Sequence, residues 1–322
     1  MSQADIQIPL ADVREIYRVT DIERAQDDAP AGRSEALSAI YEKMKKLGGD
    51  RYLVKPSSTD ALDSLYDDCP NFAEVIDDLK KYLALAVSGN EPVHFTPILL
   101  LGEPGIGKTH FAKCLSFALG TGYEFVPMSS LTAGWILSGA SSQWNNAKPG
   151  KVAAALIHGE YANPLMVLDE VDKAGGDSRY DPMGPLYGLL ERDTAKKFKD
   201  EFVEVDIDAS HILWVSTAND ERTLSEPILN RMNVYSVPRP NAEQAFRIAC
   251  KLYAEILADH QWGFPPQAPE DVMEALAAVP PRDMRKRLMV AFGNAKLDHR
   301  DELQMKDLDA SRIQRGKTHM GF

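Results

Sequence analysis

Apolar positions follow two patterns along this 322-residue chain. From residue 97 onward, runs of four to six mostly apolar residues alternate with segments of helical length, at 97–101, 124–128, 165–168 and 211–216. Short runs of this kind are typical of strands that are buried on both faces of a parallel sheet. The pattern therefore predicts an α/β domain with a mostly parallel sheet and helices on both faces.

Elsewhere, apolar residues recur at intervals of three and four, which predicts amphipathic helices. Two such segments, 34–47 and 71–87, precede the first run, and three follow the last one, at 241–260, 269–279 and 281–297. These patterns divide the chain into a helical extension (1–69), an α/β domain (70–238), a small all-α domain (239–308) and a polar tail (309–322).

The composition indicates which kinds of partner this protein is expected to bind. Lys and Arg total 36 against 48 for Asp and Glu, and the resulting net charge of −12 disfavours an extended nucleic-acid surface. Three scattered cysteines show no metal-ligand spacing and are typical of a reducing compartment. No leader pattern and no long apolar span is visible, so we expect a cytoplasmic protein without a membrane partner.

A glycine-rich loop follows the first apolar run. Its sequence, GEPGIGKT at 102–109, fits G-x-x-x-x-G-K-[ST] between a predicted strand and a predicted helix. Such glycines let backbone N–H groups surround a phosphate, while Lys108 reaches the β- and γ-oxygens and the Thr109 hydroxyl ligates Mg²⁺. The loop predicts nucleoside triphosphate binding by Gly102, Glu103, Pro104, Gly105, Ile106, Gly107, Lys108, Thr109 and His110.

Two adjacent carboxylates, Asp169 and Glu170, come directly after the third apolar run. Alone, they are equally compatible with a solvated turn. Because they follow a phosphate loop, we expect Asp169 to hold Mg²⁺ through water and Glu170 to polarise the attacking water. Successive residues at a strand end point in different directions, so one carboxylate can face the metal and the other the γ-phosphate.

With these motifs in order, the sequence resembles an AAA+ ATPase, and specifically the ATPase module of the Lon proteases, over roughly residues 70–300. The resemblance implies ATP as the nucleotide and Asn219, in STAN at 216–219, as the sensor of the γ-phosphate. It also implies that Arg231 reaches into a neighbouring subunit and that Arg282, or failing that Arg285, acts from the helical domain. The implied catalytic set is Lys108, Glu170, Asn219, Arg231 and Arg282.

The same resemblance places a substrate loop at 138–152, where Trp144 and Asn145 stand at the positions of the aromatic and aliphatic residues that grip a polypeptide. A tryptophan is more often a core residue. Here Trp144 lies among Ser, Gln and Asn without an apolar period, which favours exposure.

The resemblance thus implies a homo-oligomeric ring, a hexamer, that uses ATP to remodel, unfold or thread a protein partner. Little sequence follows the helical domain, so we expect no peptidase domain of the Lon type. Two alternatives stay open. One is a nucleic-acid-associated ATPase, such as a helicase loader or a subunit of a DNA-mobility or defence system, and the other is a scaffold that assembles on ATP without turnover.

Overall fold

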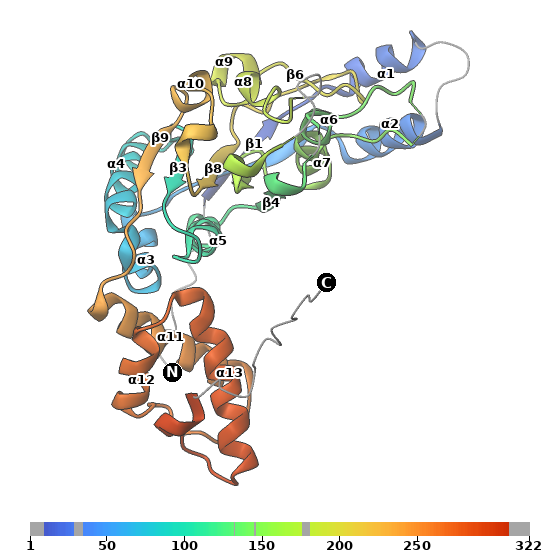
Figure 1. The fold of residues 1–322 in the computed structure, drawn as a ribbon. Helices are drawn as coiled ribbons and strands as arrows, with labels where there is room; N and C mark the ends of the chain where they lie inside the picture. The colour runs from blue at the N-terminus through green and yellow to red at the C-terminus, as the bar shows by residue number, and fades with distance from the viewer. Residues whose placement is uncertain (1–9, 29–34, 132, 145, 176–180, 309–322) are drawn as a thin grey trace. The chain divides into compact units, whose positions relative to one another are not determined.

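The structure is a computed structural model that describes residues 10–28, 35–131, 133–144, 146–175 and 181–308 (Figure 1). Asn145 and the predicted tail at 309–322 lie outside these residues. The chain forms two compact units. The first comprises residues 1–65, 73–102 and 108–237, and the second comprises 66–72, 103–107 and 238–322.

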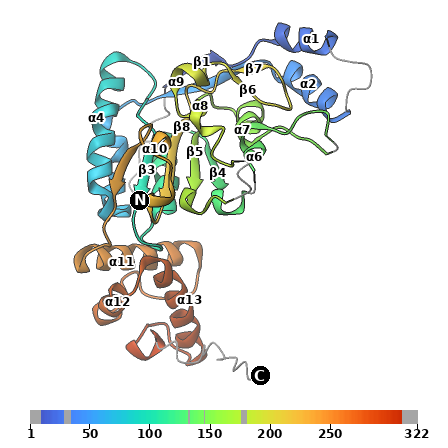
Figure 2. The ribbon, with the colours of Figure 1, turned by 45° about the horizontal axis from the view of Figure 1, so that its top comes forward.

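A five-stranded parallel sheet is the centre of the first unit, with the strand order β4-β5-β8-β3-β9 (Figure 2). The strands are β3 (Ile98–Leu101), β4 (Tyr123–Pro127), β5 (Leu165–Asp169), β8 (Leu213–Ala218) and β9 (Asn233–Ser236). The four predicted strands and the α/β class are confirmed. The fifth strand, β9, was not predicted because it is only four residues long and has the polar residues Asn233 and Ser236 at its ends.

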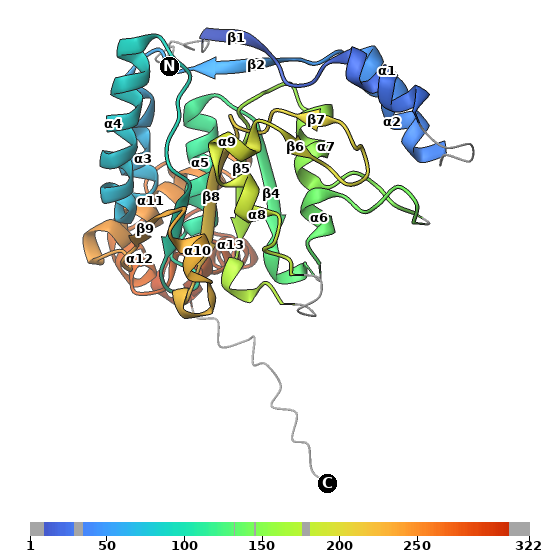
Figure 3. The ribbon, with the colours of Figure 1, turned by 90° about the horizontal axis from the view of Figure 1, so that it is seen from above.

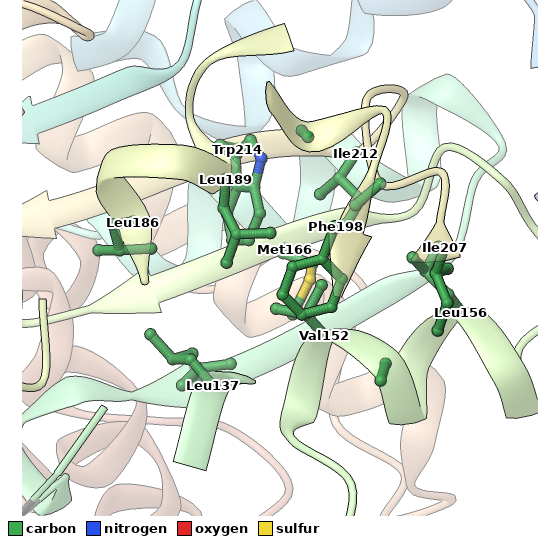
Figure 4. Packing of buried hydrophobic residues seen from close by; sticks show 14 of the residues in the cluster. Leu137, Val152, Leu156, Met166, Leu186, Leu189, Phe198, Ile207, Ile212 and Trp214 are labelled. Atoms are coloured by element: carbon green, nitrogen blue, oxygen red, sulfur yellow. The ribbon is translucent and has the colours of Figure 1, made fainter. Parts of the chain in front are cut away.

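Helices complete this unit, and most are short. After the N-terminal segment, the longer ones are α4 (Ala73–Gly89), α5 (Lys108–Leu119) and α7 (Lys151–His158), and the four-residue helices are α6 (Trp135–Ser138), α8 (Leu186–Leu189), α9 (Arg192–Ala195) and α10 (Glu226–Leu229). Figure 4 shows Met166 of β5 and Trp214 of β8 among side chains from α6, α7 and α8. Burying each large apolar side chain contributes about 1.5–3 kcal/mol, so this cluster fixes the strand ends relative to the helices.

The N-terminal segment differs from the helical extension that we predicted. Besides α1 (Val19–Asp27) and α2 (Glu35–Leu47), it contains the antiparallel strands β1 (Leu10–Glu15) and β2 (Asp50–Lys55). The described side chains of β1 are exposed, so the strand has no buried stripe that a sequence pattern could reveal. Figure 3 shows α1 and α2 side by side, at the opposite end of the unit from α4.

This segment is nevertheless part of the first unit. The buried Arg51 of β2 donates from Nε to the carbonyl of Leu156 (2.9 Å) and from Nη2 to that of Ile157 (2.7 Å), near the end of α7. The backbone of Tyr52 accepts a hydrogen bond from the N–H of Ala162 at 2.7 Å. Guanidinium donors at a helix C-terminus satisfy carbonyls that have no partner within the helix.

The second unit is helical, as predicted. It contains α11 (Ala242–Asp259), α12 (Glu270–Ala277), α13 (Pro281–Leu297) and the 3-10 turn η7 (Met305–Leu308), around a core that includes Tyr253 and Phe292. Two segments that we had assigned to other domains belong to it. Pro70 accepts a hydrogen bond from Gln244 (2.9 Å) and Ile106 accepts one from Asn71 (3.3 Å), which ties 66–72 and 103–107 into this unit.

The remaining short elements are α3 (Ser64–Asp68), β6 (Phe198–Lys199), β7 (Asp206–Ile207), and the 3-10 turns η1 (Thr59–Leu62), η2 (Pro70–Phe72), η3 (Met128–Ser130), η4 (Val171–Lys173) and η6 (Glu221–Thr223). Among the helices that the structure describes, none has the length and apolar character needed to cross a bilayer.

Candidate functional site

Asp169 is the meeting point of three elements of the first unit. Its Oδ1 accepts hydrogen bonds from the hydroxyl of Thr109 at 2.6 Å and from that of Thr217 at 2.9 Å. Thr109 lies in the first turn of α5, Asp169 ends β5, and Thr217 lies near the end of β8. Because β5 and β8 are parallel neighbours, their carboxyl ends lie side by side, and ligand sites in such folds are usually found at these ends. Two predicted site residues, Thr109 and Asp169, are therefore in direct contact.

Glu170 has a left-handed backbone, with φ 56° and ψ 51°. This conformation is uncommon outside glycine and costs of order 1–3 kcal/mol, and such strain is found preferentially at functional sites. It lets the Glu170 N–H donate to the Thr217 hydroxyl at 2.9 Å. The Glu170 carboxylate pairs with Lys173, and the hydrogen bond from Lys173 lowers the pKa of Glu170. The group is thus a carboxylate at neutral pH, as a general base must be.

Lys108 and Asn219 are brought together as the sequence predicts. The Lys108 side chain is buried, and its Nζ donates to the Gly102 carbonyl at 2.6 Å and to Asn219 Oδ1 at 3.0 Å. Burial, the largest cause, lowers the pKa of Lys108, while Asp172 and Asp169 act in the opposite direction. This cation is desolvated at the strand ends, which strengthens its attraction for phosphate oxygens.

Asp172 is a residue whose role the sequence analysis missed. Its Oδ2 accepts hydrogen bonds from the N–H groups of Asn219 (3.0 Å) and Asp220 (3.3 Å), so it holds the backbone just beyond β8. Its Oδ1 is buried and, within the described residues, has no hydrogen-bond partner. Thr217 was missed as well, although it lies in β8 only two positions before Asn219.

The middle of the glycine loop is described within the second unit. Gly105 and Gly107 have φ values of 85° and 102°, which L side chains rarely adopt. A Cβ on Gly105 would lie 3.3 Å from Cβ of Arg282, so Arg282, in the first turn of α13, lies against this loop. Glu103 pairs with Arg239. Arg285, in contrast, lies near Glu255 (3.9 Å) and Asp259 (3.7 Å) of α11.

His110, which the sequence also predicts to bind the nucleotide, is exposed on α5. Its Nε2 lies 3.4 Å from Sγ of Cys114, one turn further along the helix.

Arg231 is held apart from the strand-end residues. Its Nε lies 3.1 Å from Oε1 of Glu191 and its Nη1 donates to the Pro227 carbonyl at 2.6 Å, while its guanidinium carbon lies 5.9 Å from the Tyr187 ring centroid. These partners belong to the region of α8 to α10, where Arg231 also lines a cavity of about 280 Å³.

Trp144 is 53% exposed. Its ring meets that of Trp135 edge-to-face, with centroids 5.7 Å apart and an interplanar angle of 81°. Contact with one neighbouring ring leaves half of the side chain accessible, which is unlike a core tryptophan.

The donor set suits magnesium. The Thr109 hydroxyl and the Asp169 carboxylate are hard oxygen ligands that already lie within hydrogen-bond distance of each other. Mg²⁺ prefers one or two such protein ligands together with water and substrate phosphates. The residues therefore fit a magnesium nucleotide.

The parallel sheet, the glycine loop and the Thr109–Asp169–Thr217 contacts define a P-loop nucleotide-binding domain. The family model "ATPase family associated with various cellular activities (AAA)" matches residues 98–237, so this part of the chain is an AAA domain. Within it, the chain resembles the ATPase part of the Lon proteases. It is 31% identical to Lon protease of Nitrosococcus oceani over 73% of this chain, and 28% identical to peroxisomal Lon protease homolog 2 of Oryza sativa subsp. indica over 77%.

The chain spans 30% and 28% of the length of these two relatives. Solved structures with the same fold include the RuvB Holliday junction branch migration motor from Thermotoga maritima, at 17% identity and a TM-score of 0.50, covering 73% of this chain and 66% of that one. They also include Hsp104 in a closed state with ATPγS and FITC casein, at 15% identity and a TM-score of 0.58, covering 74% of this chain and 48% of that one. At these identities the likeness concerns the fold.

Proposed function

We propose that this protein hydrolyses ATP and uses the turnover, in an oligomeric ring, to remodel, unfold or thread a protein partner. The observation that carries the catalytic part is the pair of hydrogen bonds that join Thr109 and Thr217 to Asp169, beside the ionised Glu170. A metal ligand and a base on adjacent residues serve hydrolysis better than nucleotide binding alone.

Each residue of the site has a separate task. Lys108 and the N–H groups of the glycine loop bind the phosphates, and Thr109 with Asp169 would hold Mg²⁺. When bound, the ion neutralises the charge that develops on the β- and γ-phosphate oxygens. Glu170 takes a proton from the attacking water, and Asn219 orients that water or the γ-phosphate. Thr217 positions Asp169 and the Glu170 backbone together, so the metal ligand and the base keep one geometry.

Two arginines support an assembled enzyme. Arg231 makes its contacts in the α8 to α10 region and not with Asp169 or Glu170, as expected of an arginine that serves the site of a neighbouring subunit. Arg282 has no ion pair among the described residues, whereas Arg285 lies near two carboxylates. Of the two, Arg282 is therefore the better candidate for contacting the γ-phosphate.

The half-exposed Trp144 supports a polypeptide as the partner. The test uses a fluorescein-labelled unfolded polypeptide as the probe and compares Trp144→Ala with Trp144→Phe. We expect the alanine variant to keep basal ATP hydrolysis and to lose stimulation by the polypeptide, and the phenylalanine variant to keep both. Stimulation that persists in Trp144→Ala would rule out the loop as the gripping element. Stimulation by DNA with a steep salt dependence would favour the nucleic-acid alternative.

A further inference from the structure

The loop that carries Trp144, a part of the first unit, has a narrow neck at its base. Gly139 and Gly150 are its two sides, and they touch backbone to backbone. A Cβ on Gly150 would lie 2.2 Å from the Leu137 carbonyl oxygen and 2.3 Å from the Gly139 nitrogen, so glycine is required there. Gly139 has φ 84°, a conformation that also favours glycine. The Ala140 N–H faces the Lys148 carbonyl at 3.5 Å just beyond the neck.

A buried carboxylate, Asp200, lies against both sides of this neck. Its Oδ2 accepts a hydrogen bond from the Gly150 N–H at 2.8 Å, and a Cβ on Gly139 would lie 2.3 Å from its Oδ1. The Glu201 N–H next to it donates to the Ser138 carbonyl at 2.8 Å. Asp200 has no exposed surface, and within the described part of the chain no Lys, Arg or His forms an ion pair with it.

The other oxygen of Asp200 holds the turn on which the residue sits. Oδ1 accepts hydrogen bonds from the N–H groups of Phe202 (2.9 Å) and Val203 (3.1 Å), between β6 and β7. The two carboxylate oxygens thus have different tasks. Oδ2 ties the turn to the loop neck, and Oδ1 shapes the turn itself.

This turn is firmly attached to its surroundings. Figure 4 shows two residues of the turn's strands next to residues of α7: Phe198 of β6 lies next to Val152, and Ile207 of β7 lies next to Leu156. On the other side, the Tyr41 hydroxyl of α2 donates to the Val203 carbonyl at 2.8 Å. A fixed turn is what an anchor for a protruding loop needs.

We propose that Asp200 is a positioning residue that holds the Trp144 loop by tying its neck to the β6–β7 turn, and that grip on a polypeptide depends on this tie. The proposal rests on the function proposed for Trp144. A carboxylate suits the task because hydrogen bonds to a charged acceptor are shorter and about twice as strong as neutral ones. One of its three N–H donors, Gly150, belongs to the neck and the other two belong to the turn, so the carboxylate joins the two backbones without a side chain from the loop.

The same tie is expected to respond to pH. Burial raises the pKa of Asp200 to about 6, outweighing the three N–H bonds, and the nearby Glu201 adds to the rise. Protonation replaces one acceptor position with an O–H donor and removes the charge. The neck should therefore be tied above pH 6 and loosened below it.

The sharpest variant is Asp200→Asn, because an amide has one oxygen and one NH₂ group. With its oxygen in the Oδ1 position it keeps the bonds to Phe202 and Val203, but its NH₂ group then faces the Gly150 N–H. Asp206→Asn, at an exposed position of β7 in the same hairpin, is the matched control. Fluorine NMR of protein labelled with 5-fluorotryptophan reports the loop, since the Trp144 ring is stacked edge-to-face on Trp135.

In Asp200→Asn we expect the Trp144 signal to move while the signals of Trp214 and Trp262 stay, and stimulation of hydrolysis by the unfolded polypeptide to fall about tenfold, the size of one charge-assisted hydrogen bond. Basal hydrolysis should stay at the wild-type level. In wild-type protein the Trp144 signal should titrate with a midpoint near pH 6, and in Asp200→Asn this titration should disappear.

An unchanged Trp144 signal together with unchanged stimulation in Asp200→Asn would overturn the proposal. If that variant does not fold, amide hydrogen exchange in wild-type protein decides instead. The Gly150 N–H should be protected above pH 6, and exchange at the unprotected rate would also overturn the tie. The NMR result is independent of any substrate, so it distinguishes failure of this tie from failure of the function proposed for Trp144.

Discussion

Asp169 and Asp200 are both aspartates that accept short hydrogen bonds in the first unit, and their surroundings make them opposites. Asp169 receives two hydroxyl donors at the carboxyl ends of the strands and is partly exposed. Asp200 receives three backbone N–H donors and has no exposed surface. Hydroxyls can rotate and yield to a metal ion, whereas backbone donors cannot move without moving the chain.

From this difference we infer that the Asp169 carboxylate can bind a ligand, whereas the Asp200 carboxylate has a structural role. At the strand ends, side chains meet side chains, so a ligand can replace their mutual contacts. At the loop neck, a side chain meets only backbone, and its loss would change the path of the loop. The following three predictions test this contrast, in order of decreasing free-energy effect.

Glu170→Gln should have the largest effect, because it removes the base at the strand-end site while keeping the shape of the side chain. We expect ATP hydrolysis to fall about 10³-fold, within the range typical of general-base removal. ATP binding should persist, and sedimentation with ATP should show the assembled oligomer. Glu124→Gln on β4 is the control and should hydrolyse ATP normally. Hydrolysis at the parent rate in Glu170→Gln would show that another group activates the water.

The pH dependence of stability should single out Asp200. Its folded pKa of about 6 exceeds the ordinary value of 3.8, so the folded state binds the proton more tightly. Protonated Asp200 therefore adds to the stability of the folded protein. This contribution is complete below about pH 4, declines as the pH rises towards 6, and is lost above it. Urea unfolding should show the free energy of unfolding of Asp200→Asn, relative to wild type, rising by about 2 kcal/mol from pH 4 to pH 7.

Because both proteins share every other titrating group, a difference that stays constant with pH would contradict the raised pKa of Asp200. A rise in the same difference for Asp206→Asn would contradict its assignment to this residue.

Thr217→Val should have the smallest effect of the three. It keeps the shape of the side chain but removes the donor to Asp169 and the acceptor of the Glu170 N–H. We expect kcat for ATP hydrolysis to fall about tenfold, equivalent to ~1–2 kcal/mol for a lost buried hydrogen bond. Ser216→Ala is a matched control one residue away, because the Ser216 hydroxyl is buried and has no hydrogen-bond partner in the described residues. Equal losses in the two variants would mean that the Thr217 hydroxyl has no special role.

The sequence predicted those parts of the molecule that local patterns encode. The apolar runs gave β3, β4, β5 and β8, and the glycine motif led to Lys108 and Thr109. The motifs also gave Thr109 and Asp169 roles at one magnesium ion, and the structure brings these two side chains into contact, although they are 60 positions apart in the chain.

The parts that the sequence did not predict depend on long-range contacts with no local signal. Asp200 and Gly150 are 50 positions apart, and neither belongs to a periodic pattern. Asp172 caps a strand end that is 47 positions away. Strand β9 begins and ends with polar residues, and the described side chains of β1 are exposed, so neither forms a continuous apolar run.

The contacts of Arg51 determine where this protein can be truncated. It lies outside residues 98–237, which the family model matches, yet it is 6% exposed and caps the carbonyls of Leu156 and Ile157 inside that range. A truncation at the family boundary would strip α7 of these donors and leave buried carbonyls without partners. The part that the family model matches is therefore smaller than the packed unit of this chain, and any transfer of this ATPase domain must include Arg51 as well.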